Sequence, residues 1–338
     1  MRAYKRGSAK SRPSRKRETM PEGSLGQPTL LDARKFRDAG VTATGDARAS
    51  VALERLSTLW VNTGTLCNIT CVNCYIESSP VNDRLAYIRA DEVRVYFDEI
   101  AGGGWPVDEI SFTGGEPFMN PDFLEMLEDA LQRDFRALVL TNAMKPLWNK
   151  RERLAAIRER HEDRLCIRVS VDHFTRANHE ALRGPGSWKA VTEGLRWLAD
   201  NGFALAVAGR TVWGEAEEST RAGYAALFSA LELPVDAWDP GALVLFPEMD
   251  ANADVPEITT ACWGILDVDP ASVMCATSRM VVKRKGAEAA AVVSCTLLSY
   301  EPAFEMGRTL AESAGRVKLN HPHCAKFCVL GGASCSAA

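Results

Sequence analysis

Three cysteines in the stretch TGTLCNITCVNCY (63–75) are the first residues of this sequence whose types and spacing could do chemistry. Cys67, Cys71 and Cys74 follow the pattern C-x3-C-x2-C, and thiolates so close together are typical ligands of zinc or of an iron–sulfur cluster. Four protein ligands would complete either kind of centre. Three therefore predict a metal centre with one coordination position left for a ligand that is not protein.

The remaining cysteines indicate a second metal site near the C-terminus. The 338 residues include ten cysteines, six of which follow residue 260, and the N-terminal stretch lacks the apolar core of an export signal. We therefore expect a reducing, cytoplasmic location, where clustered cysteines bind metal or do redox chemistry. Cys166 lies alone in a strand-like pattern and is interpreted as a small buried residue.

Six short β-prone runs alternate with helical patterns and predict the elements that position the first site. Helical periodicity separates consecutive runs, as in NPDFLEMLEDALQR and SWKAVTEGLRWLADNG. Such units in series imply a parallel sheet covered by helices, and in barrels of this kind chemistry collects where loops leave the carboxyl ends of the strands. The predicted strands are 57–62, 109–113, 137–142, 165–172, 203–209 and 242–246.

The loops after these strands carry the unusual residues. The cysteine loop follows the first strand and TGGEPFMN (113–120) follows the second, while TNAM, SVDHF, GRTVWGE and FPEMD follow the others. Because the strands are predicted to be parallel, these loops should meet at one end of the sheet. The sequence therefore predicts one site, built from several loops.

The cysteine loop, the aromatic residue Tyr75 and the GGEP sequence about forty residues later resemble the radical S-adenosylmethionine (radical SAM) superfamily. The resemblance implies an α/β fold, a partial (β/α)6 barrel similar to a TIM barrel, with a small cysteine-rich iron–sulfur extension at the C-terminus. It also implies a [4Fe-4S] cluster on Cys67, Cys71 and Cys74, whose fourth iron is chelated by the amino and carboxylate groups of S-adenosylmethionine. The cosubstrate would thus be the missing ligand.

The chemistry that the resemblance implies is the reductive cleavage of S-adenosylmethionine. One electron, from a donor such as flavodoxin or ferredoxin, breaks the C5′–S bond, and the resulting 5′-deoxyadenosyl radical abstracts hydrogen from a substrate. We expect an enzyme whose reaction class, oxidoreductase or transferase, is open. A non-catalytic iron–sulfur electron carrier and a zinc-dependent nucleic-acid module are the alternatives from other function classes.

Eight residues are implied as S-adenosylmethionine contacts. Glycines would let the backbone approach the methionine end of the cofactor, and a carboxylate would accept from its amino group. Polar residues at the later strand ends would contact the ribose and the methionine carboxylate, although caps, turns and surface ion pairs would explain the same residue types. The eight are Gly114, Gly115, Glu116, Pro117, Asn142, Ser170, Asp172 and Arg183.

The C-terminal cysteines are similar to those of SPASM and twitch extensions, which hold auxiliary [4Fe-4S] clusters in radical SAM enzymes. Two β-prone arms around Lys285-Gly286 predict a hairpin that ends at Cys295. The resemblance implies one auxiliary cluster, because there are too few cysteines for two, and a structural zinc ribbon is the alternative. The implied ligands are Cys275, Cys295, Cys324 and Cys328, with Cys335 or Cys262 as a substitute or a free thiol.

Composition and charge set the remaining expectations. The first twenty residues hold eight Lys and Arg against one Glu, so we expect 1–50 to be a basic, largely disordered segment, followed by the barrel (51–255) and the auxiliary-cluster domain (256–338). The whole chain has a net charge of −4, so the rest is acidic, which argues against a nucleic-acid partner. No apolar run is long enough for a membrane span.

The substrate is the least determined feature. His173, Arg210, Glu248 and Asp250 follow strand ends and could bind a polar substrate, although ion pairs and caps would place the same residues there. The segment before the first strand looks too short and polar for a separate peptide-recognition domain. We therefore expect a small-molecule substrate, with a peptide-modifying maturase as the alternative.

Overall fold

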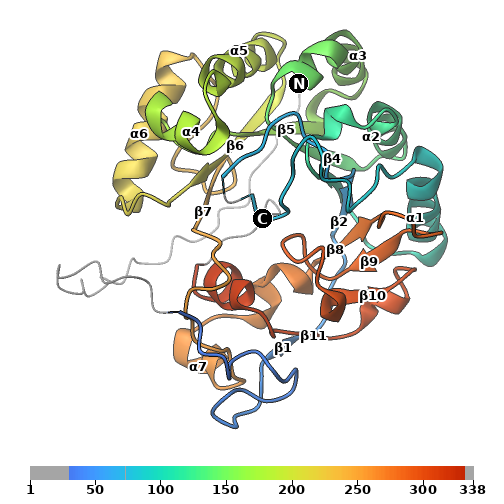
Figure 1. Cartoon of the computed structure of the whole chain (residues 1–338). Coiled ribbons are helices and arrows are strands. Elements are labelled where there is room, and N and C mark those ends of the chain that lie inside the picture. Colours follow the sequence, from blue (N-terminus) through green and yellow to red (C-terminus); the bar gives the residue numbers. More distant parts are fainter. Residues whose placement is uncertain (1–29, 73, 332–338) are drawn as a thin grey trace, which may run out of the picture.

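A nine-stranded sheet organises the part of the chain that the computed structural model describes, residues 30–72 and 74–331. Six strands are parallel neighbours in chain order, and the predicted strands agree with them to within two residues at each end. The curved sheet has its helices on the outside (Figure 1), so the predicted α/β architecture is confirmed. These strands are β2 (Thr58–Asn62), β3 (Glu109–Thr113), β4 (Arg136–Thr141), β5 (Leu165–Ser170), β6 (Ala204–Arg210) and β7 (Leu243–Phe246).

Helices connect successive parallel strands, as the periodicity predicts. In α2 the buried residues Phe123, Met126, Leu127 and Ala130 recur every three or four positions, so one side of the helix packs on the sheet. The other connecting helices differ in length and also bury part of their surface. The connecting helices are α1 (Ala90–Gly103), α2 (Phe123–Gln132), α3 (Lys145–His161), α4 (Arg176–Arg183), α5 (Ser187–Asp200) and α6 (Glu217–Ala230).

Both faces of the sheet are buried, and they belong to two different hydrophobic cores. On β2, Leu59 and Val61 join the core that includes Phe97 of α1, whereas Trp60 joins a second core with Met280. Successive side chains of a strand point to opposite faces, so β2 separates the two cores. The outer core holds the helices, and the inner core holds the C-terminal part of the chain.

The C-terminal region extends the same sheet. The predicted hairpin is confirmed: β8 (Ser278–Val282) and β9 (Ala291–Val293) are antiparallel, and β10 (Glu305–Gly307) continues from β9. The sequence did not predict that β8 would also pair in parallel with β2, on the side away from β3. The division of the chain at residue 255 stays a prediction.

Part of the N-terminal region is ordered, contrary to our expectation for residues 1–50. Arg48 forms a buried ion pair with Glu257, and the Leu31 N–H donates to the Asn252 carbonyl at 2.7 Å. β1 (Ser50–Val51) pairs with β11 (Val317–Lys318). The expectation extended the composition of the first twenty residues too far, because 30–50 contains apolar residues that pack. Residues 1–29 lie outside the described part.

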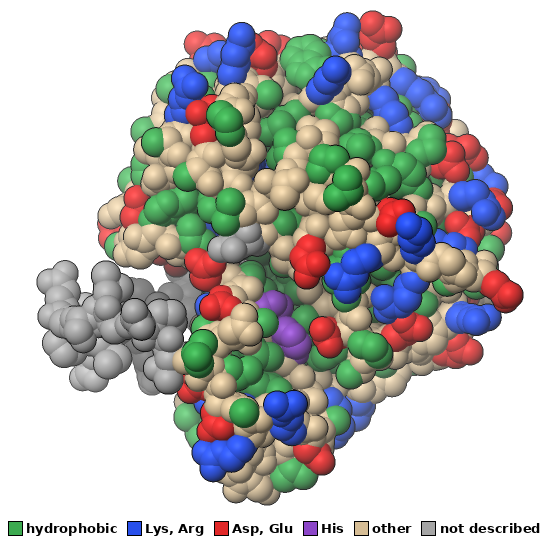
Figure 2. All heavy atoms as spheres, viewed as in Figure 1, with side chains coloured by type: hydrophobic (Ala, Val, Ile, Leu, Met, Phe, Trp, Pro, Cys, Tyr) green, Lys and Arg blue, Asp and Glu red, His purple; other side chains and the backbone are tan. Residues whose placement is uncertain are grey.

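One face of the molecule shows mixed charge. On the face drawn in Figure 2, Lys and Arg side chains are interspersed with Asp and Glu and do not form a continuous basic patch. Among the described residues, no helix combines the length and apolar character that crossing a membrane requires.

Candidate functional site

The loop that carries the three N-terminal cysteines leaves the carboxyl end of β2 and is fixed by main-chain hydrogen bonds. The Cys67 N–H donates to the Ser79 carbonyl at 3.0 Å, and the Glu77 N–H donates to the Cys74 carbonyl at 2.9 Å. The Val72 N–H reaches the Leu182 carbonyl at 2.8 Å, which ties the loop to the end of α4. The backbone therefore holds the cysteines at the predicted end of the sheet.

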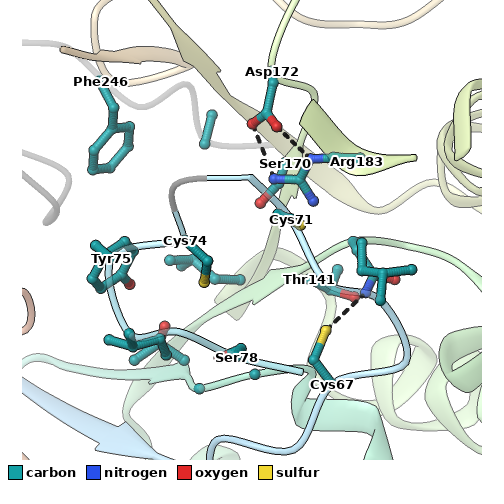
Figure 3. A pocket seen from close by; sticks show the side chains of 18 of the residues that line it. Cys67, Cys71, Cys74, Tyr75, Ser78, Thr141, Ser170, Asp172, Arg183 and Phe246 are labelled. Carbon is teal, nitrogen blue, oxygen red and sulfur yellow. Dashed lines mark hydrogen bonds and ion pairs between the residues drawn. The ribbon is translucent and has the colours of Figure 1, made fainter. Parts of the chain in front are cut away.

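The three thiols line one cavity of about 1000 Å³, counted with its open mouth. Figure 3 shows the thiols around this space, with the Asp172–Arg183 pair opposite Cys67. Six of the eight implied cofactor residues also line it: Gly114, Gly115, Asn142, Ser170, Asp172 and Arg183.

The surroundings of Cys67 and Cys71 disfavour a thiolate unless a metal cation lies beside it. Burial raises the pKa of Cys67 to about 12 and also raises the pKa of Cys71. Such thiols become thiolates when a metal replaces the proton. Asn142 Nδ2 lies 3.8 Å from Cys67 Sγ and donates to Asn68 Oδ1 at 2.9 Å. The donor set of three thiols on a roomy cavity fits an iron–sulfur cluster with an open iron.

The structure gives the glycines of the GGEP loop a reason beside the one we expected, which stays a prediction. A Cβ on Gly115 would overlap the Leu66 carbonyl oxygen and lie 2.7 Å from the Thr65 oxygen. Gly114 has φ +146°, and its Cβ would lie 2.6 Å from the Gly64 oxygen. Glycine is required because two backbone segments touch, immediately before Cys67. Both residues line the cavity, and their small size also positions the cysteine loop.

Glu116 and Pro117 are not among the residues that line the cavity. The Glu116 carboxylate is fully buried and accepts from Thr141 Oγ1 at 2.8 Å, from the Asn142 N–H at 2.9 Å and from the Phe118 N–H at 3.2 Å. Burial raises its pKa to about 7. In this structure Glu116 joins the GGEP loop to the end of β4, and its contact with a cofactor amino group stays a prediction.

Asp172 and Arg183 are partners of each other. Arg183 donates from Nε at 2.8 Å and from Nη2 at 3.0 Å to the two carboxylate oxygens of Asp172. Burial alone would raise the pKa of Asp172, but the Arg183 guanidinium holds it below its ordinary value. The sequence predicted both residues as cofactor contacts. Since two N–H groups of Arg183 are engaged by Asp172, only its remaining N–H groups could reach a carboxylate in the cavity.

The candidate substrate residues separate into two groups. Arg210 lines the cavity, whereas His173, Glu248 and Asp250 do not. The His173 ring accepts from the Thr175 N–H at 2.9 Å and lies 3.1 Å from Glu215, so it braces the start of α4. Sequence reasoning missed the apolar part of the cavity wall. Its signal was the position of these residues at or just after predicted strand ends: Leu140, Phe246 and Met249.

Tyr300, from the C-terminal region, was also missed. Its Oη donates to the Ile76 carbonyl at 2.9 Å and accepts from Asn82 Nδ2 at 3.3 Å, and Arg84 lies over its ring. No local pattern marks this residue, because the contact spans more than 200 positions of the chain. The C-terminal region thus helps to fix the cysteine loop.

Four C-terminal cysteines line a second cavity. They are the four implied ligands Cys275, Cys295, Cys324 and Cys328, and apolar side chains form most of the remaining wall. Burial raises the pKa of Cys275 to about 11 and that of Cys324 well above its ordinary value. Cys262 is not in this wall and accepts from the Thr259 N–H at 3.4 Å. Cys335 lies outside the described residues.

The family comparison agrees with the motif order. Residues 61–217 match the model described as the Radical SAM superfamily. The matched range runs from β2 to the start of α6, so it includes the cysteine loop, the GGEP loop and the Asp172–Arg183 pair.

Three curated relatives are similar over the same region. AlbA of Bacillus subtilis (strain 168), the antilisterial bacteriocin subtilosin biosynthesis protein, is 28% identical over 42% of this chain and 30% of its own. The mycofactocin maturase MftC of Mycobacterium tuberculosis (strain ATCC 25618 / H37Rv) is 30% identical over 41% and 33%. An AdoMet-dependent heme synthase of Nitratidesulfovibrio vulgaris (strain Hildenborough) is 26% identical over 42% and 36%. The similar region spans about a third of each relative.

Solved structures share the fold over a longer range. Streptococcus suis SuiB bound to the precursor peptide SuiA has a TM-score of 0.54 at 10% identity, over 76% of this chain and 63% of SuiB. The AdoMet-bound anSMEcpe has a TM-score of 0.52 at 14% identity, over 76% of both chains. These likenesses show that the fold extends beyond the matched residues 61–217.

Proposed function

Because residues 61–217 form a radical SAM domain, we propose that this chain is an enzyme that cleaves S-adenosylmethionine reductively at a [4Fe-4S] cluster held by Cys67, Cys71 and Cys74. Members of this superfamily bind that cluster and S-adenosylmethionine. The observation that carries the proposal is the cavity at the carboxyl ends of the parallel strands. Its described wall contains three cysteines and neither a fourth cysteine nor a histidine, which leaves one iron for the cosubstrate.

When bound, the cluster and S-adenosylmethionine would supply a 5′-deoxyadenosyl radical that takes hydrogen from the substrate, with the electron coming from a donor such as flavodoxin or ferredoxin. The chain would position these groups. Gly114 and Gly115 place the cysteine loop, and Glu116 holds the GGEP loop on β4. Asn142 and Ser170 offer polar atoms to the cofactor from two neighbouring strand ends.

We further propose that the second cavity holds one auxiliary [4Fe-4S] cluster with four protein ligands. Cys275, Cys295, Cys324 and Cys328 share one wall. Four thiols around one cavity suit a cluster, in which each thiolate binds a different iron, and one zinc ion stays the alternative.

The enzyme proposal is tested by anaerobic reconstitution with iron and sulfide, followed by reduction with dithionite and measurement of 5′-deoxyadenosine. We expect 5′-deoxyadenosine to form only when S-adenosylmethionine and reductant are both present. A reconstituted protein that binds iron and sulfide but forms no 5′-deoxyadenosine would instead favour an electron carrier. Zinc without sulfide would favour the zinc module.

For the substrate we propose a peptide as the first class to test. SuiB, which shares the fold, is seen with a precursor peptide, and a maturase and a bacteriocin biosynthesis protein are among the relatives. The small molecule expected from the sequence stays an alternative, and the heme synthases among the relatives give it a chemical class. The apolar residues Leu140, Phe246 and Met249 would suit either kind of partner.

Deuterium transfer decides between these classes. Candidate peptides and porphyrins, each deuterated at the carbon positions to be tested, are incubated with the reduced enzyme, and 5′-deoxyadenosine is examined by mass spectrometry. We expect deuterium to enter 5′-deoxyadenosine from a peptide. Transfer only from a porphyrin would overturn the peptide proposal and leave the radical chemistry intact.

A further inference from the structure

The wall of the C-terminal cavity has one polar side chain that the four cysteines do not explain. Apart from the thiols, the described wall is apolar except for Ser294 and His323. Ser294 Oγ donates to the Phe304 carbonyl at 3.2 Å, so its hydroxyl is already engaged. Apart from the thiols, His323 is therefore the remaining polar side chain of the described wall, and it makes no hydrogen bond within the described chain.

His323 is buried at the edge of the metal-binding segment. Its side chain is part of a residue that is 7% exposed, and Nδ1 has no hydrogen-bond partner in the described chain. A buried imidazole nitrogen without a partner is costly, by about 1–3 kcal/mol for a typical polar group. Buried ring nitrogens usually have a hydrogen-bond partner. An occupant of the cavity would provide one.

The neighbouring histidine lacks this property. His321 stacks edge-on against His323, with ring centroids 4.6 Å apart, but His321 is not part of the cavity wall. Its Nδ1 accepts from the His323 N–H at 3.1 Å. The two histidines are thus close in sequence and space, and they differ in that only His323 lines the cavity.

The surroundings of the cavity suit an anionic occupant. The described wall contains no carboxylate. Behind Cys275 lies the guanidinium of Arg279, a residue that is 1% exposed, which donates to the Cys275 and Ser278 carbonyls at 2.7 Å and to the Ser313 carbonyl at 2.8 Å. Main-chain carbonyls thus accept the hydrogen bonds of this buried guanidinium, and no carboxylate of the described chain does. A cluster with four thiolate ligands carries net negative charge, which a buried cation stabilises.

We propose that His323 donates a hydrogen bond from Nδ1 to a sulfur of the cluster held by Cys275, Cys295, Cys324 and Cys328, and thereby stabilises its reduced state. The inference rests on the proposed auxiliary cluster. His323 is a positioning residue and not a ligand. Hydrogen bonds to cluster sulfurs withdraw negative charge and raise the reduction potential, because reduction adds an electron to the cluster.

The test uses a protein in which Cys67, Cys71 and Cys74 are all Ala, so that only the C-terminal cluster is observed. His323→Phe keeps a flat ring of similar size without a donor, and His321→Phe is its matched control. We expect equal iron and sulfide in both and a more negative midpoint potential in His323→Phe alone, measured by an anaerobic redox titration followed by electron paramagnetic resonance. His323→Asn, which keeps an N–H donor, should recover part of the shift.

A second measurement detects the hydrogen bond itself. In deuterium oxide, electron–nuclear double resonance of the reduced cluster should show an exchangeable deuteron that His323→Phe removes and His321→Phe keeps. Equal potentials in the two Phe variants, or equal shifts in both, would overturn the proposal. Strong coupling to a histidine nitrogen, or iron loss in His323→Phe alone, would overturn it by making His323 a ligand. Zinc without sulfide would instead overturn the auxiliary cluster and leave the first site untouched.

Discussion

The two cysteine cavities differ in how the chain builds them. The first takes its three thiols from eight consecutive residues, 67–74, and completes its wall with polar groups from neighbouring strand ends, such as Asn142 and Asp172. The second gathers four thiols from three distant segments around 275, 295 and 324–328, within a largely apolar wall. A short loop can present three ligands and leave one side of the metal centre accessible. Segments from distant parts of the chain can instead surround the metal centre.

The difference suggests separate tasks for the two sites. An open iron next to polar side chains is suited to binding a cosubstrate. A site with four protein ligands in an apolar wall is suited to electron transfer or to holding the C-terminal region in place. Phe246, in the wall of the first cavity, stacks on Phe327, between Cys324 and Cys328, with ring centroids 5.2 Å apart. One aromatic pair therefore joins the wall of the first cavity to the segment that carries Cys324 and Cys328.

The largest effect should come from removing the first set of thiols. With Cys67, Cys71 and Cys74 changed to Ala, 5′-deoxyadenosine formation should fall to the level without enzyme, because the cosubstrate loses its iron. About four irons and four sulfides per chain should remain at the second site. Cys166→Ala is the control, since Cys166 lines neither cavity and should keep activity. Activity in the triple variant would contradict the assignment of the open site.

The next largest effect should come from Gly115. Gly115→Ala would push a Cβ into the Leu66 carbonyl and displace Cys67, so we expect loss of iron from the first site only. The overpacking should cost about 1–3 kcal/mol of unfolding free energy. Gly102→Ala, which meets nothing within 4 Å in α1, should stabilise the helix by roughly 0.5–1 kcal/mol. Full iron content with weaker S-adenosylmethionine binding would instead mean that Gly115 contacts the cofactor.

A third variant asks whether the polar side of the first cavity depends on its buried ion pair. Asp172→Asn leaves Arg183 without its carboxylate and should cost about 3–5 kcal/mol, measured by urea denaturation. Glu257→Gln, which breaks the buried pair with Arg48, is the matched control, since neither residue lines the cavity. Both should lower stability, and only Asp172→Asn should also weaken S-adenosylmethionine binding.

The pH dependence of that variant has a defined sign. Because the pKa of Asp172 is lowered in the folded protein, its contribution is complete above the unfolded value of about 3.9 and is lost as the pH falls through the lower folded pKa. The stability difference between wild type and Asp172→Asn should therefore be constant from about pH 8 to 5 and shrink only below about pH 4. A difference that disappears between pH 7 and 5 would contradict the paired, ionised state.

The smallest effect should come from the contact between the two regions. Tyr300→Phe removes the hydroxyl that donates to Ile76, which should cost about 1 kcal/mol and speed the loss of the first cluster to a chelator. Tyr96→Phe removes a similar bond, to the Arg308 carbonyl at 3.0 Å, away from the cysteine loop. Equal chelation rates in the two variants would show that Tyr300 does not support the loop.

The sequence could predict those features that local patterns determine. The β-branched runs and the helical periodicity predicted β2 to β7. Residue type and spacing predicted that Cys67, Cys71 and Cys74 share one site, and the three thiols do line one cavity. Turn signals located the hairpin around Lys285-Gly286, where Gly286 has φ +78°.

Features that depend on long-range contacts could not be predicted in the same way. The parallel pairing of β8 with β2 joins positions more than 200 residues apart, and no local pattern states it. The direction of the Glu116 carboxylate is set by Thr141 and Asn142 as well as by Phe118 of its own loop, and only the last of these contacts is local. For the same reason the sequence does not show that a Cβ at position 115 would overlap the Leu66 carbonyl, which is why the position requires glycine.

The most direct test of the contrast between the two cavities is electron paramagnetic resonance of the reduced protein with and without S-adenosylmethionine. Wild type and the variant lacking Cys67, Cys71 and Cys74 are compared, so that the difference between their spectra isolates the first cluster. We expect S-adenosylmethionine to change that difference spectrum and to leave the spectrum of the variant unchanged. A response in the variant, or none in the difference spectrum, would contradict the account of one open and one closed cluster.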